Sequence, residues 1–111
     1  MYYRPRRLDR VFRALADPTR RRIVRDLARD DRTVMELARQ FAISQPAVTK
    51  HLHVLEAAGL ISRTREGRTR RCRLRPAGLR ASRAWIDRCE RFWNRRLDAL
   101  ERLLADISEE E

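Results

Sequence analysis

A run of polar side chains between residues 44 and 53 has the chemistry needed to read the edges of DNA base pairs. The stretch Ser44-Gln-Pro-Ala-Val-Thr-Lys-His-Leu-His53 carries hydroxyl, amide, ammonium and imidazole groups. When such groups project from one helix, they donate hydrogen bonds to base edges in the major groove and accept hydrogen bonds from them. The side chains expected to contact DNA here are Ser44, Gln45, Pro46, Thr49, Lys50 and His53.

A second cluster with binding chemistry lies between Leu60 and Leu74. Two short segments of strand character, 60–65 and 69–74, flank a turn at Glu66-Gly67-Arg68, which predicts a β-hairpin. Because Cys72 and Leu74 alternate with their neighbours, we expect one face to pack inward and the other to meet phosphate. The arginines expected to meet phosphate are Arg63, Arg65, Arg68, Arg70 and Arg71, with Arg73 beside them.

Two helices joined by a short turn would position the first cluster. Thr33 and Glu36 have the spacing of a capping box, and Ser44 can cap a second helix that carries Pro46 in its first turn and ends at Gly59. Apolar residues recur at helical spacing in both helices, which predicts their buried faces. These residues are Val34, Leu37, Ala38 and Phe41 in the first helix and Ala47, Val48, Leu52 and Leu55 in the second. Two such helices followed by a hairpin predict a winged helix-turn-helix.

The flanking segments complete a mainly α fold of order α-α-α-α-β-β-α with a small β-hairpin wing. Residues 8–16 and 18–30 are predicted helices, the second capped by Asp17, and a last helix is predicted from Pro76. We expect residues 8–107 to form a single DNA-binding domain, with 76–107 as its dimerisation helix, and residues 1–7 to form a basic N-terminal arm.

The predicted last helix has more apolar surface than so small a domain can cover. Its aromatic and aliphatic residues are spaced by threes and fours, which favours pairing with a second copy of the chain. An alternative is that this helix folds back along the first helix of its own chain. The expected dimer interface comprises Val11, Phe12, Leu15, Trp85, Ile86, Cys89, Phe92, Trp93, Leu97, Leu100 and Leu104.

Charge also favours a polyanionic partner. The 111-residue chain has a formal net charge of +11, from 26 arginines, one lysine and 16 acidic residues. Arginine in this excess also fits GC-rich codon usage, so its distribution is the better guide. Residues 59–83 carry nine arginines against one acid, whereas residues 84–111 carry five against eight acids. With no apolar run long enough to cross a bilayer, we expect a cytoplasmic, nucleoid-associated protein without membrane contact.

Several motifs together resemble the ArsR/SmtB family of bacterial winged-helix repressors. They are Phe12-Arg-Ala-Leu-Ala-Asp-Pro-Thr-Arg-Arg-Arg-Ile23, Ser44-Gln-Pro-Ala-Val-Thr-Lys-His-Leu52, Leu55-Glu-Ala-Ala-Gly-Leu-Ile61 and Arg65-Glu-Gly-Arg68. This resemblance implies a homodimer held by its first and last helices and bound to an inverted-repeat operator in a promoter. It further implies that the helix from Ser44 reads bases while the wing holds the flanking backbone.

The metal-ligand positions of that family carry other residues in this chain. Thr33 and Met35 stand where the arsenic-type sensor has Cys-x-Cys, and neither supplies a thiolate. Asp87 and Cys89 could imitate half of the zinc-type site, but leucines occupy the places of the other half, at Leu100 and Leu103. The tail, with Ala84-Trp-Ile86 and Arg91-Phe-Trp93, resembles the branch that does not sense metals. We therefore expect a repressor with no metal and no cofactor, whose inducer the sequence does not identify.

Two alternatives stay open at this point. Cys72 and Cys89 leave room for a thiol-responsive sensor, and with the two histidines for a metal-responsive one. A non-specific architectural or RNA-binding protein would use the same positive charge without sequence preference. An enzyme is not expected, because no phosphate-binding glycine loop and no nucleophile with a plausible base is found.

Overall fold

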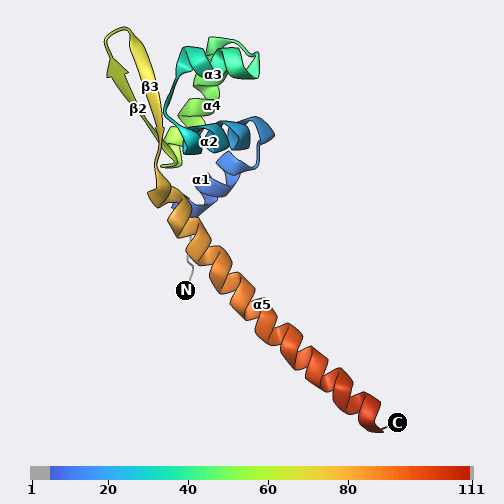
Figure 1. Ribbon diagram of the computed structural model, residues 1–111. Helices are drawn as coiled ribbons and strands as arrows, with labels where there is room; N and C mark the ends of the chain where they lie inside the picture. Colours follow the sequence, from blue (N-terminus) through green and yellow to red (C-terminus); the bar gives the residue numbers. More distant parts are fainter. Residues whose placement is uncertain (1–5, 111) are drawn as a thin grey trace. The chain divides into compact units, whose positions relative to one another are not determined.

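The computed structural model describes residues 6–110 (Figure 1). Two units follow one another along the chain, the first reaching to Ala81 and the second beginning at Ser82. The elements are α1 (Arg6–Leu15), α2 (Pro18–Arg29), β1 (Arg32–Thr33), α3 (Val34–Phe41), α4 (Gln45–Ala57), β2 (Ile61–Glu66), β3 (Thr69–Leu74) and α5 (Pro76–Glu110). The predicted winged helix-turn-helix is confirmed, and the predicted arm at 1–7 lies almost entirely outside the described residues.

The predicted caps set the helix starts. The Asp17 side chain accepts a hydrogen bond from the Arg20 amide, and both halves of the capping box between Thr33 and Glu36 are formed at 3.2 Å. Ser44 accepts from the Ala47 amide at 3.2 Å and so begins α4. Gly59 has a φ of +76°, a conformation that glycine adopts at low cost, and it turns the chain out of α4.

The sheet has three strands in the order β1-β3-β2, and both pairs are antiparallel. The sequence predicted only β2 and β3, the two strands of the hairpin. It did not predict β1. Arg32 and Thr33 pair with Cys72 and Arg71, which ties the start of α3 to the wing. Figure 1 shows the hairpin beside α3 and α4.

The core of the first unit joins all four helices to the sheet. Val48, Leu52 and Leu55 on α4 are 0 % exposed, as the predicted stripe required, whereas Ala47 is only half-buried. The other buried members are Val11, Ala14, Ile23, Leu27, Leu37, Ala58, Leu60, Ile61 and Cys72. Because one face of α4 packs against this core, the opposite face is held in a fixed orientation beside the wing.

A buried carboxylate links three elements next to this core. Asp26 on α2 is 6 % exposed; it accepts hydrogen bonds from Arg32 Nε at 3.1 Å and from Gln40 Nε2 at 3.0 Å. A buried charge is tolerated only when it is paired and hydrogen-bonded. Asp26 therefore fixes β1 and α3, the first helix of the helix-turn-helix, against α2.

A close backbone approach joins the start of α5 to the end of α4. A Cβ built on Gly78 would lie 2.8 Å from the Gly59 carbonyl oxygen and 3.1 Å from Leu60 Cδ2. We expect Gly78→Ala to lower the unfolding free energy by about 1–3 kcal/mol, because the added methyl group forces the backbone apart. Denaturant titration measures this, with Ala77→Gly as the control for helix propensity. Equal or higher stability of Gly78→Ala would contradict the close approach.

The second unit is the continuation of α5, which runs to Glu110 and so extends past the predicted end at residue 107. Its large apolar side chains are 40–60 % exposed. They are Trp85, Ile86, Phe92, Trp93, Leu97, Leu100, Leu103, Leu104 and Ile107. Within residues 6–110, no helix is both long and apolar enough to span a bilayer.

Candidate nucleic-acid interface

A groove of about 280 Å³ lies between the exposed face of α4 and the wing. Gln45 and Thr49 line it from α4, and Arg68, Thr69 and Arg70 line it from the wing. The start of α3 closes it, through Thr33, Val34 and Met35. The structure thus brings the two polar clusters of the sequence to one surface.

The predicted reading face of α4 is accessible. Ser44, Gln45, Pro46, Lys50 and His53 are exposed, and Thr49, which lines the groove, is half-buried. Gln45, Thr49 and His53 are four residues apart and therefore follow one line along the helix. An amide and a hydroxyl placed at the N-terminal half of such a helix have the donors and acceptors that base edges recognise.

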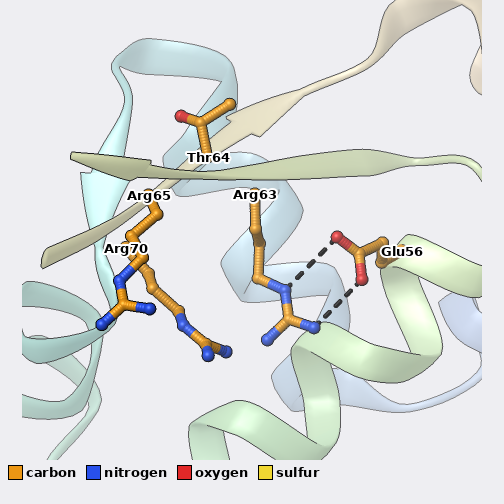
Figure 2. A pocket seen from close by; sticks show the side chains of 5 residues that line it. All are labelled: Glu56, Arg63, Thr64, Arg65 and Arg70. Atoms are coloured by element: carbon orange, nitrogen blue, oxygen red, sulfur yellow. Dashed lines mark hydrogen bonds and ion pairs between the residues drawn. The ribbon is translucent and has the colours of Figure 1, made fainter.

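The wing arginines divide between two faces of the hairpin. Residues directly opposite one another share a face, and the register pairs Arg65 with Arg70, Arg63 with Cys72 and Thr64 with Arg71. Figure 2 shows Arg63, Arg65 and Arg70 on one side of the hairpin and Thr64 on the other. Because Cys72 is fully buried on the first face, that face is the one turned toward α4.

The outer face carries arginines that already have acidic partners. Arg71 Nε lies 3.2 Å from Glu66 Oε2, and Arg73 Nε lies 3.1 Å from Asp31 Oδ2. The expectation that this outward face meets phosphate stays a prediction; these two arginines would have to exchange a carboxylate partner for the phosphate, and exposed ion pairs are weak enough for that. Arg65, Arg68 and Arg70 are exposed and form no ion pair with any carboxylate of residues 6–110.

Arg63 is held against α4 (Figure 2). Its Nε and Nη2 donate to the two Glu56 carboxylate oxygens at 3.4 and 3.0 Å, and Nη2 lies 3.1 Å from His53 Nδ1. The Arg63 side chain is only 9 % exposed, and its Nη1 is buried without a hydrogen-bond partner among the described residues. The hydrogen bonds from Arg63 lower the pKa of Glu56 below its ordinary 4.5, so Glu56 is ionised at neutral pH. Sequence reasoning missed Glu56, whose role depends on a strand that follows it in the chain.

The two cysteines are free thiols in different environments. Cys72 is fully buried and Cys89 is partly exposed. Burial raises the pKa of the Cys72 thiol to about 11, which suppresses the thiolate that oxidants and metals require. Cys89, expected at the dimer interface, lies on α5 among the exposed apolar side chains.

We expect Cys72 to resist alkylation at neutral pH while the protein is folded. A Cys89→Ser variant isolates this thiol, so mass spectrometry after treatment with iodoacetamide should show no adduct until denaturant is added. Rapid labelling of the folded variant would contradict the burial and would favour a thiol sensor.

The positions that carry metal ligands in the resembled family have other roles in this structure. The Thr33 hydroxyl caps α3, and Met35 is a 46 % exposed residue at the groove. Leu100 and Leu103 belong to the exposed apolar stripe of α5. Among residues 6–110, no group of three histidine, cysteine, aspartate or glutamate side chains is placed to hold a metal ion.

One of the residues expected at the dimer interface is buried inside its own chain instead. Val11 is 1 % exposed and lies in the core of its own chain, so its side chain is not available to a partner. Phe12 and Leu15 are half-buried, and the expected residues of α5 are at least partly exposed.

A helix-turn-helix pair, a reading face on α4 and a basic wing together define a winged-helix DNA-binding protein. A family model described as a helix-turn-helix domain matches residues 15–64. The chain is 45% identical over 96 residues to the HTH-type transcriptional regulator Rv2034 of Mycobacterium tuberculosis, covering 86% of this chain and 87% of that protein. It is 42% identical over 60 residues to the transcriptional repressor SdpR of Bacillus subtilis, covering 54% of this chain and 67% of that protein.

A solved structure of an ArsR-like transcriptional regulator from Rhodococcus sp. RHA1 matches with a TM-score of 0.77 and 36% identity, over 87% of this chain and 92% of that one. The chain belongs to the ArsR/SmtB family of helix-turn-helix transcriptional regulators. It is a DNA-binding transcriptional regulator, as the sequence predicted.

Proposed function

We propose that this protein is a homodimeric, metal-independent cytoplasmic repressor that binds an inverted-repeat operator in a promoter. The observation that carries the proposal is the groove in which Gln45 and Thr49 of α4 lie beside Arg68 and Arg70 of the wing. Base-reading groups and phosphate-binding groups on one surface are what sequence-specific binding requires.

The roles of the individual residues follow from their exposure and partners. Gln45 and Thr49 read base edges, with Ser44, Pro46, Lys50 and His53 around them. Arg65, Arg68 and Arg70 contact phosphate, because they are exposed and carry no acidic partner among the described residues. Arg71 contributes less, since Glu66 holds it, and Arg63 stays on its own chain.

The exposed stripe of α5 supports the dimer. Nine large apolar side chains that are 40–60 % exposed on one helix form a patch that soluble proteins cover with a partner. Pairing of two copies is economical, because a two-fold dimer places two reading helices on two half-sites of a palindrome. Thr33 and Met35 in place of thiolate ligands, and leucines at 100 and 103, support independence from metals.

Substitutions at the groove test whether its α4 side reads bases and its wing side contacts phosphate. Gln45→Ala or Thr49→Ala should weaken binding to the cognate promoter by about 1–3 kcal/mol and leave random duplex unchanged. Arg68→Ala should weaken both and flatten the salt slope by about one unit. Titrations of both duplexes at several salt concentrations measure this. Equal weakening of both duplexes by Gln45→Ala would show that α4 does not read bases.

A further inference from the structure

The structure leaves Arg63 unsuited to the phosphate contact that its place in the wing predicted. Its side chain leaves β2 on the face of fully buried Cys72 and is only 9 % exposed. Both Glu56 oxygens hold its guanidinium through Nε and Nη2. Arg63 is therefore a fixed donor at the side of α4.

Arg63 Nη2 and His53 Nδ1 lie 3.1 Å apart, and only one of these two atoms can be the hydrogen-bond donor. A guanidinium group has five N–H donors, no acceptor and stays protonated at any physiological pH. Arg63 must donate, so His53 Nδ1 must accept with its lone pair. A neutral imidazole carries one hydrogen, and that hydrogen must then be on Nε2.

We infer that Arg63 is a positioning residue that holds His53 in the Nε2–H form, so that α4 presents an N–H donor to an acceptor on DNA. Glu56 supports it by orienting the guanidinium with two hydrogen bonds. This inference rests on the proposed function, because it assumes that the α4 face meets DNA.

The fixed tautomer determines what His53 can contact. His53 is exposed and follows Gln45 and Thr49 on the same line of the helix. An N–H donor pairs with a phosphate oxygen or with purine N7, guanine O6 or thymine O4. It cannot accept from the amino groups of cytosine or adenine. Arg63 thus affects DNA recognition without contacting DNA.

The first test is the tautomer itself, measured by long-range ¹H–¹⁵N correlation NMR of the free protein at a pH high enough that the ¹⁵N shifts of both histidine rings no longer change. His51 is the only other histidine and serves as an internal reference. We expect Nε2–H in the wild type, a mixture of tautomers in Arg63→Met and recovery of Nε2–H in Arg63→Lys, which keeps a donor. An Nδ1–H form in the wild type would overturn the inference. Because no DNA is present, this result is independent of the proposed function.

The second test separates positioning from direct contact. If Arg63 acts through His53, Arg63→Met should weaken promoter binding roughly 5- to 10-fold in the wild type, about the strength of one hydrogen bond, and not at all in a His53→Ala background. The slope of affinity against salt should not change, whereas Arg68→Ala should lower it by about one unit. Equal losses in both backgrounds, with a flatter slope, would make Arg63 a phosphate contact. Should Arg63→Met not fold by circular dichroism, Glu56→Gln replaces it, with a smaller effect in the same directions.

The third test identifies the acceptor on DNA. Interference by removal of single bases of all four types and interference by phosphate ethylation are compared for the wild type and His53→Ala on the same promoter fragment. Loss of one signal in the variant assigns the acceptor to a base or to a phosphate, and either result supports the inference. Unchanged patterns of both kinds would show that His53 donates to no DNA acceptor and would overturn it.

Discussion

Leu97→Asp is expected to convert the protein to a monomer and to abolish tight binding to the full promoter site. Leu97 is 53 % exposed in the apolar stripe of α5, between Trp93 and Leu100. In the proposed dimer the new carboxylate would be buried without a partner, which costs about 3–5 kcal/mol and weakens pairing by more than a hundredfold. Operator binding falls with it, because a monomer engages one half-site instead of two.

Sedimentation and DNA titration at the same protein concentration measure both effects. The matched control is Ala105→Asp, which adds the same carboxylate on the side of α5 that carries Asp98, Glu101 and Arg102. This variant should remain a dimer. A Leu97→Asp monomer that still binds the full site tightly would contradict the dimer argument, and a monomeric wild type would favour the fold-back alternative.

Asp26→Ala should have the largest effect on stability. Removing this carboxylate leaves Arg32 and Gln40 without their shared acceptor beside the core. Breaking a buried charged pair costs about 3–5 kcal/mol, and because the Arg32 side chain keeps 26 % exposure we expect about 2–4 kcal/mol. Since β1 and α3 lose a common anchor, DNA affinity should fall even where the protein is still folded.

Denaturant titration and promoter binding measure the two consequences. Asp30→Ala is the control, because Asp30 also faces Arg32, at 3.5 Å, but is 73 % exposed. A surface pair of this kind contributes about 1 kcal/mol or less. Equal destabilisation by the two substitutions would show that burial of Asp26 is not what matters.

Local signals predicted the helix-turn-helix well. The Thr33–Glu36 box and the Ser44 cap act within four residues, so the chain specifies them without reference to the rest of the fold. The buried stripe of α4 followed in the same way from helical spacing. These features position the reading face, which is why the candidate site was largely recognisable before the structure.

The features that sequence missed depend on distant partners. Strand β1 is only Arg32–Thr33, too short to show alternation, and it exists because β3 pairs with it about 40 residues later. Nothing in the sequence distinguished Arg63 from the other wing arginines. Its burial follows from the hairpin register and from Glu56 on α4, a contact that no local pattern specifies.

The most direct measurement is a competition titration of the purified protein on its own upstream promoter fragment against random duplex, at ~150 mM salt, with and without zinc. A metal-independent repressor should prefer the promoter by ~10³-fold or more, and zinc should leave that preference unchanged. Equal affinity for both duplexes would contradict sequence-specific repression, and a preference that stoichiometric zinc abolishes would contradict independence from metals.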